Sequence, residues 1–209
     1  MTNLTFTHRF EPATRLEAAP LLLLHGTGGD ENDLLPLGHM IAPGAALLSV
    51  RGQVLEHGMP RFFRRLAEGV FDQEDVARRA HELADFVDAA RKTYGIAAPM
   101  ALGYSNGANI AAAIMLLRPR TLAGGILLRA MVPLTDTPAT DLSGTSVLVL
   151  SGQRDPIVPA ANGAQLAAML TTAGADVERR VVPVGHELSQ ADLTLARQWL
   201  ETLRTPAAA

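Results

Sequence analysis

The chain has 209 residues, of which 48% are hydrophobic, and its 18 Lys and Arg residues against 21 Asp and Glu give a net charge of −3. This balance indicates neither a basic surface for nucleic acid nor a basic face for membranes, so we expect a small, largely uncharged partner molecule. The absence of cysteine from the sequence excludes disulfides, cysteine nucleophiles and cysteine-ligated metal sites.

The length predicts one domain over residues 1–209, because a chain of this size can bury roughly 70% of its unfolded surface around a single core. Residues 1–6 lack the basic stretch and the long apolar stretch of a signal peptide. No later run approaches the roughly 20 apolar residues that a membrane-spanning helix needs. We therefore expect a cytoplasmic protein with no membrane partner.

Short apolar runs alternate with helical patterns along the chain. The apolar runs are typical of strands buried on both faces, and they cover residues 21–24, 46–50, 99–102, 125–128, 146–150 and 181–184. The helical patterns lie between them, at residues 33–41, 73–94, 106–117, 160–173 and 189–204. This alternation predicts an α/β fold with a doubly wound, mostly parallel sheet flanked by helices.

Two of these helices carry boundary signals. Asp72 precedes Asp75 by three residues at the start of the 73–94 helix, and Gly95 follows the last residue of that helix. Ser189 and Asp192 have the same spacing at the start of the last helix. Acceptor side chains at such positions cap free N–H groups, and glycine suits the turn after a helix, so these local signals agree with the periodicity.

Residues 51–71 fit neither the helical nor the strand period. The segment holds several glycines and three of the six phenylalanines of the chain, Phe62, Phe63 and Phe71. Irregular segments of this length in a compact domain are usually functional or disordered. We interpret this one as an ordered flap that lines a pocket; the alternative is that its rings only anchor a long crossover to the core.

The most informative motif is Gly-Tyr-Ser-Asn-Gly at residues 103–107, between an apolar run and an alanine-rich helix. Gly-x-Ser-x-Gly in this context is typical of a nucleophile elbow, in which the serine occupies a tight, strained turn. Glycines suit the flanking positions because they carry no side chain that would collide with the turn. Ser105 is therefore the candidate nucleophile, although an ordinary turn can share the pattern by chance.

A serine hydroxyl is a weak nucleophile and needs an adjacent base to accept its proton. His186 lies on a short loop between the last predicted strand and the last predicted helix, at the sheet edge where Ser105 should emerge, and is the candidate base. Solvated or packed imidazoles are the commoner explanation for the competing histidines in a predicted strand, in helices or in the flap, which are His8, His39, His57 and His81.

The base in turn needs a carboxylate that orients it and stabilises its cationic form. Asp155 follows the 146–150 strand on a loop at the same edge, so we predict that it orients His186. The other acidic candidates lie in a Pro/Thr-rich connection, at the opposite sheet edge or next to His186 along the backbone, and are Asp136, Asp141, Asp176 and Glu187.

Attack on an ester creates an oxyanion, which backbone N–H groups can stabilise. We predict one donor at Asn106, the residue after the nucleophile, and a second at Thr27 in the glycine-rich loop 25–30. This loop lacks the Lys-Ser/Thr ending of a P-loop and the Gly-x-Gly-x-x-Gly spacing, which disfavours a phosphate site. His25 is assigned a bracing role in the loop.

Together these motifs resemble the phospholipase/carboxylesterase family of α/β-hydrolases over nearly the whole chain. The segments that carry the resemblance are residues 24–31, 103–107, 152–159 and 185–187. The resemblance implies serine carboxylesterase activity without metal or organic cofactor, with Ser105, Asp155 and His186 at the triad positions. It places Thr27 and Asn106 at the oxyanion positions. Relatives in this family often form homodimers, so the resemblance also admits a homodimer.

The sequence departs from the acyl-protein thioesterases of the family, which disfavours a groove for a lipid tail; the departures are Thr27, Gly29, Tyr104, Asn106 and Ala108. The closer likeness is to compact bacterial carboxylesterases. The main hypothesis is hydrolysis of small to medium carboxylic esters through an acyl-serine intermediate. Two alternatives stay open: thioesterase or lysophospholipase action on long acyl groups of proteins, coenzyme A or lipids, and a non-catalytic hydrolase-like binding module.

In the main hypothesis, apolar side chains near the nucleophile accept the acyl or alcohol group of the ester. We expect Phe62 and Phe63 of the flap to do so, together with Met131 and Leu134, which follow the 125–128 strand.

Overall fold

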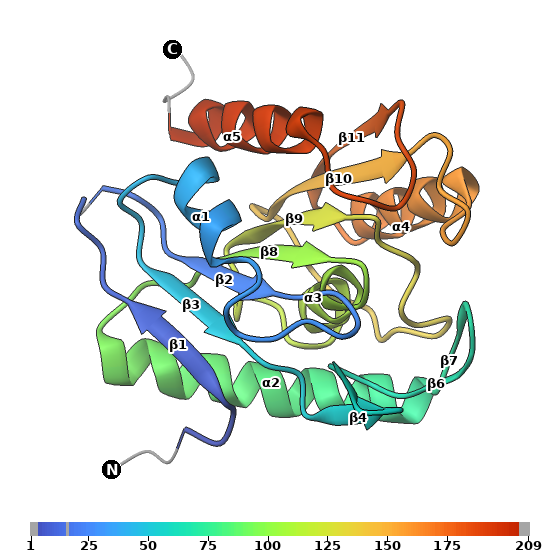
Figure 1. Ribbon diagram of the computed structural model, residues 1–209, viewed down its shortest axis with the longest axis horizontal. Helices are drawn as coiled ribbons and strands as arrows, with labels where there is room; N and C mark the ends of the chain where they lie inside the picture. The colour runs from blue at the N-terminus through green and yellow to red at the C-terminus, as the bar shows by residue number, and fades with distance from the viewer. Residues whose placement is uncertain (1–3, 16, 205–209) are drawn as a thin grey trace.

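The computed structural model describes residues 4–15 and 17–204 and is built on a seven-stranded sheet (Figure 1). Residues 1–3, part of the stretch considered for a signal peptide, lie outside the described residues. The strand order is β1-β3-β2-β8-β9-β10-β11; β1 pairs antiparallel with β3, and the pairs from β3 to β11 are parallel. The strands are β1 (His8–Glu11), β2 (Leu21–Leu24), β3 (Leu47–Val50), β8 (Met100–Tyr104), β9 (Gly124–Leu128), β10 (Ser146–Gly152) and β11 (Asp176–Val182).

Helices cover both faces of this sheet (Figure 1). They are α1 (Leu35–Ile41), α2 (Gln73–Tyr94), α3 (Asn106–Leu117), α4 (Ala160–Thr172) and α5 (Gln190–Arg204). The buried side chains of α1 and α5 share one core cluster, and those of α2, α3 and α4 share the other. The predicted doubly wound, mostly parallel sheet flanked by helices is confirmed.

The four leucines of β2 show why the central strands could be predicted. Leu22 and Leu24 belong to the core beneath α2 and α3, whereas Leu21 and Leu23 belong to the core beneath α1 and α5. Successive side chains of a strand point to opposite faces, so a strand covered on both faces must be apolar throughout.

The helix boundary signals act as caps. The Asp72 carboxylate accepts a hydrogen bond from the Asp75 N–H (3.1 Å), and Gly95 ends α2 in the left-handed conformation with a φ of 65°. At the start of α5 the N–H and the hydroxyl of Ser189 both donate to the Asp192 carboxylate (2.8 Å each). The predicted starts of these helices are therefore correct to within one residue.

The predicted strand at 181–184 is misplaced. β11 spans Asp176–Val182, and only its last residue is buried. In this sheet β11 pairs with β10 alone and forms an edge, so polar residues such as Glu178 and Arg180 are tolerated along it. The apolar signal therefore marked only the carboxyl end of the strand.

The segment 51–71 folds into two short antiparallel hairpins at the end of the molecule toward which β2, β8 and β10 point (Figure 1). The first hairpin joins β4 (Val54–Glu56) to β5 (Met59–Arg61), and the second joins β6 (Arg65–Ala67) to β7 (Val70–Phe71). Strands this short carry no clear alternation of polar and apolar residues, which is why the segment fitted neither period.

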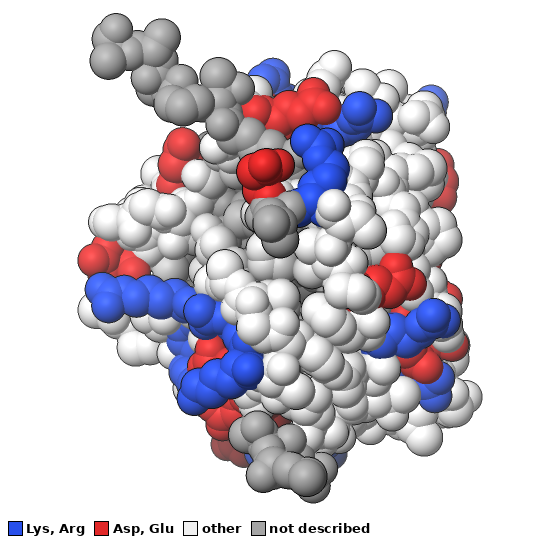
Figure 2. Space-filling view, turned by 90° about the vertical axis from the view of Figure 1, so that its left-hand side faces the viewer, with Lys and Arg blue, Asp and Glu red and all other residues white. Residues whose placement is uncertain are grey.

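Figure 2 shows the other end of the molecule, at the left of Figure 1. Positive and negative side chains are interspersed across this face, so neither sign forms a continuous field. In the described part of the chain, every helix is too short or too polar to cross a membrane.

Candidate active site

Three of the predicted site residues converge at the carboxyl edge of the sheet. Ser105 follows β8, Asp155 follows β10 and His186 follows β11. The carboxyl ends of parallel strands meet at one edge, where ligands bind in open α/β sheets. His186 Nδ1 lies 2.8 Å from Asp155 Oδ2, and His186 Nε2 lies 3.0 Å from Ser105 Oγ. The structure thus joins the three side chains in one hydrogen-bonded chain.

Ser105 occupies a strained turn between β8 and α3. Its φ of 51° and ψ of −113° place a residue with a side chain in a sparsely populated region of backbone conformation. A Cβ at Gly103 would lie 2.6 Å from the Ala108 backbone, and a Cβ at Gly107 would lie 2.0 Å from the carbonyl oxygen of Leu24. Both glycines are therefore required by the close packing that presents the serine hydroxyl at the end of β8.

The surroundings of Asp155 favour its ionised form. Its side chain is 1% exposed, and Oδ1 accepts hydrogen bonds from the N–H groups of Ile157 (2.8 Å) and Val158 (2.9 Å). Burial acts to raise the pKa of Asp155, but these two donors and His186 outweigh it and hold the pKa below its ordinary value. A carboxylate at this position selects the His186 tautomer with the proton on Nδ1, which leaves Nε2 free to accept a proton from Ser105.

The competing candidates lie elsewhere. His8 Nε2 is 2.7 Å from the Tyr94 hydroxyl, and His39 lies 2.9 Å from Glu11. Glu187 accepts a hydrogen bond from a backbone N–H two residues away rather than from the neighbouring His186 ring. In the described residues, none of these side chains is bonded to the serine.

The two predicted oxyanion residues, Thr27 and Asn106, both line the cavity beside Ser105. Among the turn, loop and cap hydrogen bonds of the described ranges, neither of their backbone N–H groups donates to a protein acceptor. The Asn106 side chain does have a partner, because its Oδ1 accepts the Phe62 N–H (2.7 Å). This bond links the start of α3 to the segment that follows β5.

The β4–β5 hairpin holds the loop that carries Thr27. The Gly28 N–H donates to the Pro60 carbonyl (2.9 Å), and Arg61 Nη1 donates to Thr27 Oγ1 (2.6 Å). Arg61 is only 3% exposed, so this contact is sheltered from water. The hairpin therefore fixes the backbone of the loop from which one oxyanion donor is expected.

His25 braces the same loop, in line with the role expected from the sequence. It is 1% exposed, its Nε2 accepts the Gly52 N–H (2.9 Å), and its Nδ1 donates to the Gly26 carbonyl (2.6 Å). Its ring centroid lies 4.8 Å from that of Phe62. Burial lowers the pKa of His25 below its ordinary value, which favours the neutral ring that these two bonds require.

Arg129, which sequence reasoning missed, holds the loop of His186. It is completely buried and forms two 2.8 Å bonds with the Asp192 carboxylate. It also donates to the carbonyls of Gly185 (3.1 Å) and Glu187 (2.9 Å), which flank His186. The available signal was an arginine directly after the apolar run 125–128, where a charge needs a buried partner.

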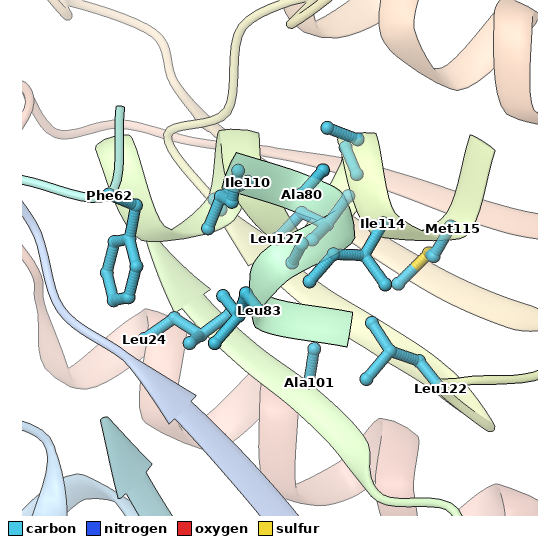
Figure 3. Packing of buried hydrophobic residues seen from close by; sticks show 14 of the residues in the cluster. Leu24, Phe62, Ala80, Leu83, Ala101, Ile110, Ile114, Met115, Leu122 and Leu127 are labelled. Atoms are coloured by element: carbon cyan, nitrogen blue, oxygen red, sulfur yellow. The ribbon is translucent and has the colours of Figure 1, made fainter. Parts of the chain in front are cut away.

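The prediction that Phe62 and Phe63 line the substrate pocket is wrong. Both rings are buried in the core, where Phe62 lies with Leu24 and Ile110 (Figure 3). Large rings gain more from an apolar core than from the polar cavity beside Ser105. The alternative weighed for this segment, anchoring of a crossover, describes these two residues.

The other two predicted pocket residues have different positions. Met131 lines the cavity beside Ser105, whereas Leu134 is buried beside a separate groove that it shares with Gln73 and Leu117. The prediction for Leu134 is therefore wrong, because its side chain is buried and does not line the cavity beside Ser105.

The cavity beside Ser105 is small, with a volume of about 40 Å³. Its apolar wall includes Phe71 and Met131, and its polar wall includes Arg61 and Asn109. A much larger open groove between α1 and α5 contains none of the predicted site residues. Over residues 4–15 and 17–204, no group of three or more His, Asp or Glu side chains is placed to hold a metal ion.

Comparison with known proteins identifies the family of the chain. A sequence model of the family described as phospholipase/carboxylesterase matches residues 9–204. The putative hydrolase MhqD of Bacillus subtilis (strain 168) is 46% identical over 181 residues, which cover 86% of this chain and 90% of MhqD.

Two solved structures are similar over almost their whole length. The Bacillus cereus carboxylesterase has 43% sequence identity and a TM-score of 0.92, with 96% of each chain covered. YahD, solved with malic acid, has 31% identity and a TM-score of 0.89, with 95% of this chain and 99% of YahD covered.

Proposed function

Since the chain belongs to the phospholipase/carboxylesterase family of α/β-hydrolases, we propose that it hydrolyses small to medium carboxylic esters through an acyl-Ser105 intermediate. The observation that carries this proposal is the continuous hydrogen-bonded chain from Ser105 through His186 to Asp155. A hydroxyl, an imidazole and a buried carboxylate in this order are the parts that acyl transfer by serine requires.

Each group has one role in the proposed reaction. Ser105 Oγ attacks the ester carbonyl carbon while His186 Nε2 takes the hydroxyl proton, and Asp155 stabilises the resulting imidazolium. The N–H groups of Thr27 and Asn106 stabilise the oxyanion. His186 then gives the proton to the departing alcohol, and water repeats the sequence on the acyl-serine to release the acid and restore the hydroxyl.

The size of the cavity supports short acyl groups. Its volume of about 40 Å³ is well below the roughly 300–1,000 Å³ of sites that enclose drug-sized ligands. Thioesterase or lysophospholipase action on long acyl chains calls for an extended apolar groove beside the serine, and the arginine and asparagine lining gives it less support.

The test is turnover of 4-nitrophenyl acetate together with labelling by a fluorophosphonate, in the wild type and in Ser105→Ala. We expect Ser105→Ala to lower the turnover of 4-nitrophenyl acetate by at least about a thousandfold and to abolish labelling, while its circular dichroism spectrum is unchanged. Ser143→Ala, which alters an exposed serine, serves as the matched control and should keep both. Turnover near the wild-type value in Ser105→Ala would end the proposal, and absence of labelling in the wild type would favour a non-catalytic module.

An acyl-length series then separates the two enzymatic candidates. For 4-nitrophenyl esters from acetate to dodecanoate, we expect kcat/KM to fall beyond butyrate, because longer chains exceed the cavity. A steady rise toward dodecanoate would instead support action on long-chain acyl groups.

A further inference from the structure

Residues that line the cavity beside Ser105 carry hydrogen-bond donors that have no partner in the described part of the chain. Asn106 and Asn109 both line it, and their Oδ1 atoms accept the N–H groups of Phe62 and Met131 (2.7 Å each). These bonds fix the orientation of both amides, so each Nδ2 group is left as a donor. Asn106 Nδ2 is buried without any partner, and Asn109 Nδ2 donates to no group in the described part of the chain.

Arg61 is a buried cation in the same cavity. It is 3% exposed; its Nε donates to the Phe63 carbonyl (3.2 Å) and its Nη1 donates to Thr27 Oγ1 (2.6 Å). Its Nη2 forms no hydrogen bond with any described residue. Since a guanidinium offers five N–H donors, part of its donor capacity is unused.

The charge around Arg61 is also incompletely balanced. Glu56, its nearest carboxylate at 3.1 Å, also accepts bonds from Arg65 at 2.8 and 3.1 Å, so one anion serves two cations. Burial, with repulsion from Arg65, lowers the pKa of Arg61 despite the attraction of Glu56. Glu68 borders the cavity as well, but it is exposed and its charge is screened by solvent.

A second carboxylate would complete this arrangement. It would balance the second cation and accept from the free donors of Arg61 and from the Asn109 amide, which are groups that recognise carboxylates. Arg61 also contacts Thr27, where an oxyanion donor is expected. A carboxylate bound by Arg61 and the reacting carbonyl would therefore be separated by a short carbon chain of the substrate. The sharing of the Glu56 carboxylate by Arg61 and Arg65 is a local feature that the nearly neutral average of the chain, on which the expectation of an uncharged partner rested, does not reveal.

We propose that the preferred substrates are esters whose acyl part carries a free carboxylate, and that Arg61 is the specificity-determining residue that binds this group. The inference rests on the ester hydrolysis proposed above and names its substrate class: short half-esters of dicarboxylic acids. Arg65, at the rim of the cavity, contributes less because it is more exposed and already pairs with Glu56.

The experiment compares two methyl esters of equal size that differ in charge, monomethyl succinate and methyl succinamate, with methanol release as the readout. In the wild type we expect kcat/KM for monomethyl succinate to exceed that for methyl succinamate by about tenfold or more. In Arg61→Gln the ratio should fall to about one, mainly through a higher KM for the anionic ester. Arg180→Gln, an exposed arginine of β11, is the matched control and should keep the wild-type ratio.

The ratio separates recognition from structural support. If Arg61 only held Thr27, Arg61→Gln would slow both esters equally and leave the ratio unchanged, which would overturn the proposal. A ratio near one in the wild type would overturn it too, even if both esters and 4-nitrophenyl acetate are turned over. No turnover of any ester would instead mark failure of the proposed esterase function itself.

A second measurement does not depend on the folding of Arg61→Gln. Succinate and succinamide are compared as competitive inhibitors of the wild type, with neutral 4-nitrophenyl acetate as substrate. We expect succinate to inhibit at about tenfold lower concentration, and addition of 0.5 M NaCl should reduce this difference. Equal inhibition by the two compounds would contradict a carboxylate site at Arg61.

Discussion

Two buried arginines line the same small cavity, and they differ in how their charges are balanced. Arg129, on the segment after β9, forms two bonds with the buried Asp192 carboxylate and donates to the backbone of the loop after β11. Arg61, at the end of β5, is nearly as buried, but its carboxylate Glu56 is shared with Arg65.

The comparison shows that burial alone does not assign a role to a charged residue. Removing a cation from water costs several kcal/mol unless a counter-charge and hydrogen bonds replace the lost hydration. Arg129 has both and serves as scaffold for the loop of His186. Arg61 shares its counter-charge with Arg65 and leaves Nη2 without a hydrogen bond in the described residues, so it can still bind an anion. The partners, rather than the exposed fraction, distinguish a structural arginine from one available to a ligand.

The largest expected effect concerns the chemistry that both arginines flank. Asp155→Asn should lower kcat for 4-nitrophenyl acetate by about 10³–10⁴, because an amide favours the wrong tautomer of His186. The free energy of unfolding should change little, since an amide oxygen can still accept the two backbone N–H bonds. Steady-state kinetics and urea unfolding measure the two quantities.

Asp141→Asn is the matched control for this change. Asp141 also accepts a backbone N–H, from Ser143 (2.9 Å), but it lies on an exposed turn away from the cavity. Its variant should keep wild-type kcat. A loss of less than tenfold in Asp155→Asn would show that another carboxylate orients the base.

The second prediction tests the comparison itself. Arg129→Met should lower the free energy of unfolding by about 3–5 kcal/mol, because it leaves Asp192 buried and unpaired. Arg61→Met should cost less than half as much, since Glu56 keeps Arg65 as a partner. Urea unfolding monitored by circular dichroism gives both values.

Removal of the orphaned carboxylate provides the control. Adding Asp192→Leu to Arg129→Met should recover part of the lost stability, because no buried charge then remains unpaired. Equal losses for Arg129→Met and Arg61→Met, or no recovery in the double variant, would mean that the two arginines do not differ as described.

Part of the site could be anticipated from the sequence because its residues follow strands that the sequence marks clearly. β2, β8 and β10 are apolar on both faces, so the loops after them, and with them Ser105 and Asp155, could be assigned to one edge. β11 was harder, because an edge strand tolerates charge and shows its apolar signal only near Val182.

The remainder depends on partners that are distant along the chain. Arg129 meets its carboxylate 63 residues later, and Arg61 meets Thr27 34 residues earlier, so no local pattern reveals either pairing. Phe62 illustrates the same limit, because whether a ring faces a pocket or the core depends on the helices that cover it. Periodicity locates elements, whereas the pairing of isolated polar groups follows from the tertiary structure.

The third prediction concerns His25, which braces the loop that carries Thr27, and its response to pH. Folding lowers the pKa of His25, so the folded state binds this proton more weakly than the unfolded chain does. The stabilisation is therefore complete above the ordinary value of 6.5 and is lost as the pH falls below it, by at most about 1.4 kcal/mol per pH unit.

Urea unfolding between pH 7.5 and 5.5 measures this dependence. His25→Gln retains an acceptor and a donor but does not titrate, so its stability should fall less steeply with acid than that of the wild type. His81→Gln, a change at an exposed position of α2, should leave the slope unaltered. Identical slopes for the wild type and His25→Gln would contradict a neutral His25 in the loop that carries Thr27.

The smallest expected effect concerns Tyr104, which contacts both the loop of His186 and the loop that carries Thr27. Its hydroxyl donates to the His186 carbonyl (3.1 Å), while its ring lies so close to Gly26 that a Cβ there would be 2.8 Å from Cδ1. Tyr104→Phe removes only the bond to the His186 loop, at a cost of about 0.5–1.5 kcal/mol. We expect kcat to fall by a few-fold with KM unchanged, because the base is less firmly placed while the cavity that holds Arg61 keeps its shape. An equal change in KM would indicate that the ring had shifted. The loop of His186 and the loop that carries Thr27 would then depend on each other through Tyr104.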